Sequence, residues 1–384
     1  MTSRLWLHGA SLYRDVVVSQ PPGVIVFGSG ALAIHDGLQW LRIVVGAWEV
    51  AGALALAGVV WTYTNGHRWA TIATAAAALV LPWTVHELGQ LTPETTAAPL
   101  VAFGWLLALR GHSAWVGVVA GLLVAVKLPM ALPAFALVFV ADDRLLAAFV
   151  GIAVAGVSVF ATAVLGGPNV WTDVIVAQSE LGTRTLHDLG GYWAQALWNL
   201  VPLIVVGAFA WREWRLSVVA AGALLTVATT VKIGTALNVI VVAEAALVPL
   251  AVVGALALWE RRDWLRWVPI AAGLFLAVQT ISLVARPEHP GLFLRPGSSN
   301  AWARVPLRTV VRLEAPFRTC GDEPIALLAF AQHKSVPRNQ PDQYLIGHSD
   351  TLRRRYDRGI TFNVCGGLTG RVRPAGAAPR GSGA

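Results

Sequence analysis

The side chains best able to do chemistry lie in short polar segments that interrupt long apolar runs. Asp15, Glu87 and Glu94 supply carboxylates, and a positioned carboxylate is a common general base for a hydroxyl group. The other candidates are cations that can hold a phosphate group and polar side chains that can bind a substrate: Tyr13, Arg14, His86, Gln90, Lys127, Arg184, His187 and Lys232. Carboxylates together with cations suit the transfer of a group from a phosphate to a hydroxyl.

Each of these residues also has a structural interpretation that needs no substrate. Lys127 and Lys232 can extend from a helix end to the lipid headgroups, which is as good an explanation as function. Glu94 stands at the start of an expected helix, where the helix dipole stabilises a carboxylate. Asp15 beside Arg14 could form a loop ion pair of little energetic value, although its neighbours favour a site. The sequence leaves both interpretations open.

The histidine and acidic residues do not form a metal-binding pattern. His86 and Glu87 are adjacent, so they cannot place two ligands on one face of a helix. We therefore predict no structural metal ion and no required cofactor.

The composition is that of a membrane protein. Of the 384 residues, 56% are hydrophobic and 13% are charged, with a mean hydropathy of +0.61, whereas soluble domains carry about 25% charged residues. The net charge of +8 comes from basic residues in short loops and in the C-terminal tail. That distribution sets membrane topology and does not point to nucleic acid. The first eight residues lack the apolar core of a signal peptide.

The apolar segments predict an all-α polytopic bundle over residues 42–285. Residues 24–35 are too short to cross about 30 Å of hydrocarbon, so we expect an interfacial or re-entrant helix there, next to the polar segment 9–23. About ten spans are expected, several of them short enough to be broken or tilted: 42–63, 69–84, 94–109, 114–126, 128–141, 145–165, 192–210, 216–232, 237–258 and 267–285.

The loops alternate in charge, which predicts the orientation. The positive-inside rule places arginine-rich loops in the cytoplasm. The expected cytoplasmic residues are Arg68, Arg110, Arg144, Arg212, Arg215, Arg261, Arg262 and Arg266, and the opposite set holds Arg42, Lys127, Arg184 and Lys232. Residues 1–41, an outward loop and interfacial helix, then face the extracytoplasmic side of the cell membrane. The candidate chemistry gathers on that side, where the longest loop, 166–191, is a hypothetical lid.

The chain after the last expected span differs in composition from the bundle. Residues 286–371 lose the long apolar runs and are expected to form a small C-terminal extracytoplasmic α/β domain. The low-complexity tail at 372–384 is expected to be disordered. The only two cysteines, Cys320 and Cys365, both fall in the expected domain. An oxidising compartment favours a disulfide between them, and two free thiols are the competing expectation.

Several motifs resemble those of GT-C membrane glycosyltransferases, the polyprenyl-phosphate-sugar-dependent enzymes related to protein mannosyltransferases and lipid aminoarabinose transferases. The order and spacing of these motifs, more than any single one, carry the resemblance, which covers roughly residues 9–350. The similar segments are Gly9 followed by Tyr13-Arg14-Asp15 and Pro21-Pro22-Gly23, then Gln90–Glu94, then Ala120–Lys127.

The resemblance implies a GT-C-like bundle that moves a hexose or pentose from a polyprenyl-phosphate donor to an acceptor on the extracytoplasmic face. It implies inversion at the sugar, a lipid-phosphate leaving group and a role in the cell envelope. Mannose or arabinose would suit the family, and the acceptor could be a glycan, a lipid or a protein. Asp15, Glu87 and Glu94 then become the candidate bases.

The chain departs from the family pattern at its start. Family members begin with a transmembrane helix and an acidic motif ahead of the Tyr-Arg-Asp segment, whereas eight residues precede Gly9 here. Two interpretations stay open: the true start lies upstream, or the protein is a truncated or degenerate member without the family base. A non-catalytic membrane protein and a lipid or sugar transporter are competing hypotheses. A transporter is expected to show internal repeats and ionisable groups near the membrane midplane, and we identify neither in the sequence.

Overall fold

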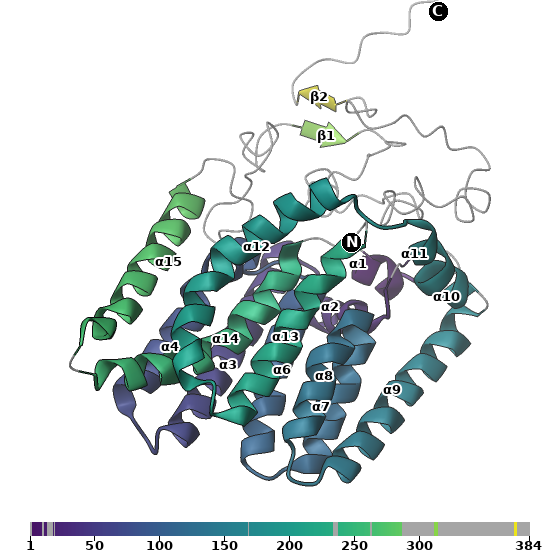
Figure 1. Ribbon diagram of the computed structural model, residues 1–384. Coiled ribbons are helices and arrows are strands. Elements are labelled where there is room, and N and C mark those ends of the chain that lie inside the picture. The colour runs from purple at the N-terminus through teal and green to yellow at the C-terminus, as the bar shows by residue number, and fades with distance from the viewer. Residues whose placement is uncertain are drawn as a thin grey trace, which may run out of the picture.

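The computed structural model describes residues 2–9, 11–13, 18, 20–167, 169–232, 237–261, 263–285, 311–313 and 372–374. Up to residue 285 these residues form a bundle of long and short helices (Figure 1). The first helices are α1 (Thr2–Leu7), α2 (Gly23–Ile34), α3 (Leu38–Tyr63), α4 (Arg68–Val80), α5 (Pro82–Glu87), α6 (Pro93–Leu109), α7 (Ser113–Val126) and α8 (Ala131–Val140). They are followed by α9 (Arg144–Gly166), α10 (Asn169–Trp171), α11 (Ala177–Glu180), α12 (Leu186–Gly207), α13 (Trp214–Ala228), α14 (Ile240–Trp259) and α15 (Val268–Ala285).

Short 3₁₀ or π turns extend or join several of these helices. The one π turn among the described residues is η2 (Thr172–Val176), between α10 and α11. The 3₁₀ turns are η1 (Leu128–Met130), η3 (Ala208–Ala210), η4 (Thr229–Val231), η5 (Leu237–Val239) and η6 (Trp264–Trp267).

Every segment expected to cross the membrane is helical, and α2 matches the expected short helix at 24–35. The expected span at 69–84 is interrupted, because Pro82 begins a new helix directly after α4. The multi-pass helical architecture is confirmed, while the total of ten spans remains a prediction. Among the described residues, six helical stretches are long and apolar enough to cross a membrane: Leu38–Tyr63, Arg144–Val164, Leu186–Ala210, Trp214–Val231, Leu237–Trp259 and Trp264–Ser282.

Helix α14 lies at the centre of the bundle. Its sequence is apolar on all sides, as expected for a helix that others enclose, and every residue from Ile240 to Ala251 is buried. It contacts α3, α4, α6, α12 and α13. Helix α15 is the opposite case, because none of its apolar stretch is buried inside the protein and it stands at one edge of the bundle (Figure 1).

Glycines allow helices to approach closely. A Cβ atom on Gly52 of α3 would lie 2.7 Å from Cβ of Pro99 in α6, and one on Gly254 of α14 would overlap the backbone carbonyl of Val206 in α12. Helices in lipid associate mainly through tight packing, since lipid tails are as apolar as the side chains. These contacts therefore contribute directly to the stability of the bundle.

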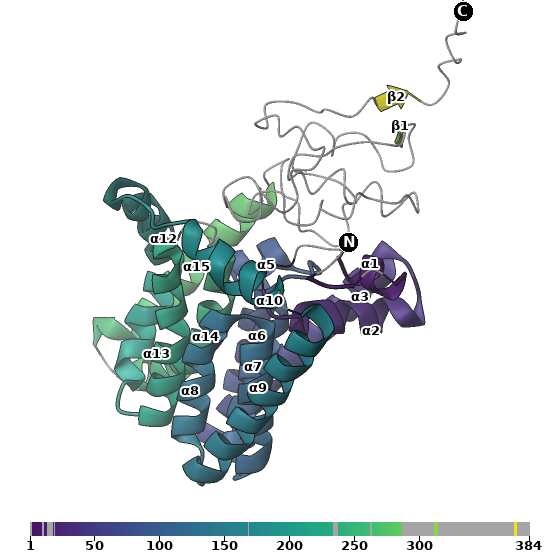
Figure 2. The same ribbon diagram turned by 90° about the vertical axis from the view of Figure 1, so that its right-hand side faces the viewer.

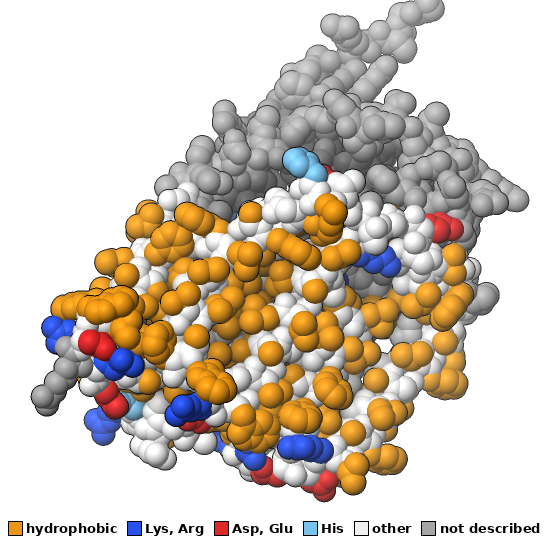
Figure 3. All heavy atoms as spheres, in the orientation of Figure 1, with side chains coloured by type: hydrophobic (Ala, Val, Ile, Leu, Met, Phe, Trp, Pro, Cys, Tyr) orange, Lys and Arg blue, Asp and Glu red, His pale blue; other side chains and the backbone are white. Residues whose placement is uncertain are grey.

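Apolar side chains cover the visible side of the bundle, and many charged side chains lie along one end (Figure 3). At that end the Arg144 guanidinium lies 4.5 Å from the ring centroid of Phe139 and 5.9 Å from that of Trp214. Arg215 pairs with Asp142 at 2.7 Å. We call this the arginine end, where α8 and α9 meet α13. Helices α1, α2, α5 and α10 lie at the opposite end (Figure 2), which we call the site end.

Two short strands are the described part of the chain beyond α15. Strand β1 (Val311–Leu313) pairs antiparallel with β2 (Val372–Pro374). Strand β1 falls in the expected α/β domain, and β2 falls at the start of the tail expected to be disordered. Cys320, Cys365 and the rest of the expected α/β domain lie outside the described residues, so the domain and its disulfide remain predictions.

Alanine substitution at two glycines tests the helix packing. An added Cβ at Gly254 would overlap the Val206 carbonyl, so we expect Gly254→Ala to lower the free energy of unfolding by about 1–3 kcal/mol. A Cβ at Gly273 of α15 would meet nothing within 4 Å, and Gly273→Ala should be neutral or stabilising by up to about 1 kcal/mol. Unfolding of the detergent-solubilised protein measures both. Equal stability of the two variants would contradict the close approach of α12 and α14.

Candidate functional site

Two buried carboxylates fasten the α5 segment, residues 82–92, to the bundle. Glu244 of α14 accepts hydrogen bonds from the backbone N–H (3.0 Å) and the hydroxyl (3.2 Å) of Thr84. Glu49 of α3 accepts one from the backbone N–H of Gly89 (3.1 Å). The first N–H groups of a helix have no partner within it, so a carboxylate is stabilised there. The α5 segment is thus held from inside the bundle at both of its ends.

The α5 segment carries a polar cluster of His86, Glu87 and Gln90. Nδ1 of His86 lies 2.9 Å from Oε1 of Glu87, and Nε2 of Gln90 donates to the backbone carbonyl of His86 (2.9 Å). The ring of Trp83 packs against the imidazole, with centroids 5.0 Å apart. The structure therefore brings together three residues that the sequence analysis selected. Glu87 is largely buried and oriented by an imidazole, which is a suitable environment for a proton-transferring group.

A second cluster joins the start of α6 to the end of α7. The amine of Lys127 lies 2.5 Å from Oε1 of Glu94, and the amide of Asn238 donates to Oε2 of Glu94 (2.8 Å). The Glu94 side chain is 0% exposed and the Lys127 side chain 12%. Each buried charge is therefore compensated by the other, and the second carboxylate oxygen is satisfied by the amide.

This geometry revises the expectations for Glu94 and Lys127. A general base must reach the hydrogen of its acceptor, whereas both oxygens of the enclosed Glu94 carboxylate are already engaged. The geometry therefore favours a structural role for Glu94. The Lys127 amine turns inward to Glu94 and does not extend to lipid headgroups. Asn238 was not selected from the sequence, because it lies 144 residues from Glu94 and no sequence pattern links the two.

A third group of contacts attaches the segment before α12 to the end of α13. Arg184 donates from Nη1 to the backbone carbonyls of Thr230 and Lys232, and its guanidinium lies 4.0 Å from the ring centroid of Tyr192. Thr183 forms a β-bridge with Lys232. Arg184 thus supplies positive charge to the carbonyl end of a helix, where it is stabilising. Burial lowers the pKa of the Lys232 amine.

The expected loop 166–191 is largely helical. Helix α10, the π turn η2 and α11 lie within it, and α12 already begins at Leu186. The side chain of His187 is exposed in the first turn of α12, away from the contacts described above. A lid function for this segment and a substrate role for His187 remain predictions.

Tyr13 lies inside the site end. Its side chain is buried, and its hydroxyl donates to the backbone carbonyl of Gln20 (2.8 Å). A Cβ on Gly166, at the end of α9, would lie 2.7 Å from the Tyr13 ring. Burial raises the pKa of the phenol well above its usual range. Tyr13 therefore organises the N-terminal segment from within, which differs from the expected direct contact with substrate. Arg14 and Asp15 lie outside the described residues, so their roles remain predictions.

An apolar groove of about 280 Å³ opens at the end of α7. It lies between the turn at Pro21-Pro22, the end of α7, helix α9 and η2. Ala125 and Leu128, which flank Lys127 in the chain, both line it. Gly23 lets the turn approach α7, since a Cβ there would lie 2.6 Å from the carbonyl oxygen of Ala125. A groove with these walls can accept an apolar chain.

Two functional candidates were missed in the sequence. Glu49 lies eleven residues into α3, about 16 Å along the helix axis, and Glu244 lies in the fully buried part of α14. A single carboxylate inside a long apolar run is a recognisable signal for a site in a membrane helix. Within the described residues, no group of three or more His, Cys, Asp or Glu side chains is arranged to hold a metal ion.

Removing one partner of the buried pair tests the structural role of Glu94. Glu94→Gln leaves the Lys127 ammonium buried without compensation, and we expect it to lower the free energy of unfolding by about 3–5 kcal/mol. The double variant Glu94→Gln/Lys127→Met removes both charges and should recover much of that loss. Asp142→Asn, which breaks an exposed pair with Arg215, is the matched control and should cost less than about 1 kcal/mol. Additive losses in the double variant would show that the two side chains do not interact.

The fold is similar to that of a solved membrane protein. No family model matches the chain, and no curated protein matches it. The crystal structure of ArnT from Cupriavidus metallidurans bound to undecaprenyl phosphate has a TM-score of 0.53 to this chain, at 15% sequence identity. The similarity covers 79% of this chain and 62% of the ArnT chain. The chain therefore spans less than two thirds of the length of ArnT and shares its fold over the matched part.

Proposed function

We propose that the protein is a membrane glycosyltransferase that moves a sugar from a polyprenyl-phosphate donor to an acceptor hydroxyl. The observation that supports this most directly is the apolar groove at the end of α7, whose lining residues Ala125 and Leu128 flank Lys127 in the chain. The fold shared with ArnT, which was crystallised with undecaprenyl phosphate, is consistent with a lipid-linked donor. No cofactor is needed, because the donor already contains its leaving group.

The donor's apolar chain would occupy the groove. Its walls are formed largely by Ala, Val, Leu, Ile, Pro and Trp side chains from α7, α9 and η2, and each buried CH₂ group of a ligand stabilises binding by about 0.8 kcal/mol. The small residues Ala155 and Ala163 on α9 keep the groove open. Its position at the end of α7 would place the donor phosphate at the site end of the bundle.

Lys232 is the cation best suited to the phosphate. Burial lowers the pKa of the Lys232 amine, and no carboxylate contributes to that shift. The charge of Lys127 is compensated by Glu94, and Arg184 is bound to helix carbonyls. An ammonium without a carboxylate partner can stabilise the negative charge that develops as the sugar–phosphate bond breaks.

The reaction needs one proton acceptor. A carboxylate would take the proton of the acceptor hydroxyl, the resulting oxygen would attack the anomeric carbon, and the bond from that carbon to the phosphate oxygen would break. Polyprenyl phosphate would leave with the electron pair. Glu87 is the best candidate among the described residues, because His86 orients it and it is not bound to a cation such as Lys127. Asp15 is the other candidate.

We further propose that this site faces the extracytoplasmic side and that the product belongs to the cell envelope. The arginine end would then lie in the cytoplasm, as the positive-inside rule requires. Mannose and arabinose are the first sugars to test, as representatives of hexoses and pentoses. Glycans, lipids and proteins are the acceptor classes.

Groove-filling variants test the donor site. We expect Ala155→Phe, which projects from α9 into the groove, to lower transfer from a radiolabelled polyprenyl-phosphate sugar in membranes at least tenfold. Val157→Phe, on an exposed position of the same helix, is the matched control and should leave transfer unchanged.

Glu87→Gln and Asp15→Asn should separate the two candidate bases by a loss of about 10²–10⁴-fold in rate for the true one. Absence of transfer with every donor would favour a non-catalytic protein or a transporter.

The pH dependence tests the role of Lys232. Burial lowers its pKa, so the ammonium loses its proton at a lower pH than a free lysine, and activity should fall as pH rises through that pKa. Lys232→Arg keeps the positive charge to above about pH 12. The alkaline limb of the kcat/KM profile should therefore shift to higher pH in this variant, and Lys232→Met should lower kcat/KM over the whole range. An unchanged alkaline limb in Lys232→Arg would exclude Lys232 as the titrating group.

A further inference from the structure

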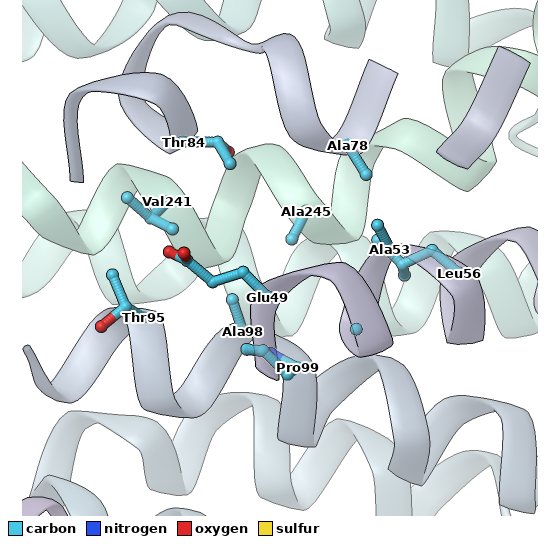
Figure 4. A pocket seen from close by; sticks show the side chains of 11 residues that line it. Glu49, Ala53, Leu56, Ala78, Thr84, Thr95, Ala98, Pro99, Val241 and Ala245 are labelled. Carbon is cyan, nitrogen blue, oxygen red and sulfur yellow. The ribbon is translucent and has the colours of Figure 1, made fainter. Parts of the chain in front are cut away.

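A small cavity lies between α3, α4, α5, α6 and α14 (Figure 4). Its volume is about 30 Å³, whereas a single buried water needs about 10–15 Å³ on this measure. Glu49 projects among the lining side chains, which are otherwise mostly alanine and other apolar groups (Figure 4). The cavity therefore has room for one small ion or one to two waters beside a carboxylate.

One oxygen of Glu49 has no partner among the described residues. Oε2 accepts the hydrogen bond from Gly89, while Oε1 is buried without a hydrogen bond. The whole residue is 7% exposed. An isolated buried carboxylate is strongly unfavourable, so such groups are normally paired or bind a cation. No described Lys or Arg forms an ion pair with Glu49, and the neighbouring Glu87 adds negative charge to the region.

Two prolines remove the usual helix partners of carbonyl groups that belong to residues lining this cavity. Pro99 in α6 and Pro249 in α14 have no N–H group, so neither can donate to the carbonyl four residues earlier. Those carbonyls belong to Thr95 and Ala245, and both residues line the cavity. No side chain in the described part of the chain donates to either of them.

The third proline inside a described helix shows how such a carbonyl is otherwise satisfied. Pro202 in α12 leaves the carbonyl of Trp198 free. Nε2 of Gln279 in α15 donates to that carbonyl at 3.0 Å. Within the described residues, a side-chain N–H group thus donates to the free carbonyl of Trp198. No described side chain donates to the carbonyls of the two residues that line the cavity.

The hydroxyl of Thr84 adds another acceptor. It donates its only hydrogen to Glu244 at 3.2 Å, so only its lone pairs remain for the cavity that Thr84 lines. These four polar groups can therefore all act as oxygen acceptors: Oε1 of Glu49, Oγ1 of Thr84 and the carbonyls of Thr95 and Ala245. A single water donates two hydrogens and cannot satisfy four acceptors, and two waters would have to direct all four of their hydrogens at these oxygens. One hard cation can be bound by all four oxygens at once.

We propose that this cavity is a binding site for a single Na⁺ ion. The ion would be held by the Glu49 carboxylate, the Thr84 hydroxyl and the two carbonyls that the prolines release. Released carbonyls of interrupted membrane helices are suitable Na⁺ ligands. One carboxylate balances one monovalent charge, and Mg²⁺ is disfavoured because it retains several waters that the cavity has no room for. This inference is independent of the proposed transferase activity.

A bound ion would link four elements of the bundle. Glu49 belongs to α3, Thr84 to α5, Thr95 to α6 and Ala245 to α14. Glu49 also holds the Gly89 turn of the α5 segment. Na⁺ should therefore stabilise the folded protein and the α5 segment together, whether or not a donor lipid is bound.

The test uses the purified full chain in detergent, without donor lipid. We expect the melting temperature to rise saturably with NaCl against choline chloride at constant ionic strength, by about 5–10 °C at 100 times Kd. Binding of ²²Na⁺ should reach one ion per chain. A melting temperature that is the same in Na⁺ and choline, with no ²²Na⁺ bound, would overturn the proposal. Stabilisation by low pH alone, without dependence on Na⁺, would also overturn it in favour of a proton on Glu49.

Two variants and a control locate the ion. Glu49→Gln should abolish both the Na⁺-dependent stabilisation and ²²Na⁺ binding. Ala98→Val narrows the cavity while keeping Glu49, and should weaken Na⁺ binding at least tenfold, so it provides the test if Glu49→Gln does not fold. Glu260→Gln removes an exposed carboxylate at the arginine end and should bind Na⁺ like the wild type. Normal Na⁺ binding by a folded Glu49→Gln variant or by Ala98→Val would place the ion elsewhere and overturn the proposal.

Discussion

The structure depends on how a low-dielectric helical bundle compensates the few charges inside it. A buried ion costs several kcal/mol unless it is paired or fully hydrogen-bonded, and three of the buried carboxylates, on α3, α6 and α14, meet this constraint in different ways. Glu94 pairs with Lys127 and Asn238. Glu244 accepts the first N–H groups of α5 and the Thr84 hydroxyl. Glu49 is half satisfied, by Gly89 alone.

These three carboxylates also decide where the polar groups of the site end can lie. Glu49 and Glu244 reach the α5 segment from α3 and α14, and so fix the turn that carries His86 and Glu87. Glu94 fixes the end of α7, from which the apolar groove begins. The positions of the proposed base and of the proposed donor groove thus follow from charge compensation deeper in the bundle.

A transferase fits this arrangement better than a transporter or a non-catalytic membrane protein does. Lipid-linked transfer needs an apolar groove, a cation near its polar end and a carboxylate within reach of an acceptor, and the site end contains a candidate for each. The fold shared with ArnT fixes neither the reaction nor the sugar or the acceptor. The cavity at Glu49 is a separate feature, because its ligands come from inside the bundle and lie apart from the groove.

The sequence by itself determined the class of the protein and nearly all of its helices. Long apolar runs, prolines at helix starts and loop arginines act locally, so each can be recognised without knowing what it packs against. The cluster of His86, Glu87 and Gln90 could also be predicted from the sequence, because its members lie within five positions of the chain. Tertiary structure decided the surroundings of Glu94 and Tyr13, whose side chains are buried among protein contacts. It also decided the partners of Glu94 and Glu244, since pairs such as Glu94 with Asn238 and Thr84 with Glu244 are 144 and 160 residues apart. Such pairs form only when helices from distant parts of the chain pack together, and no local pattern encodes them.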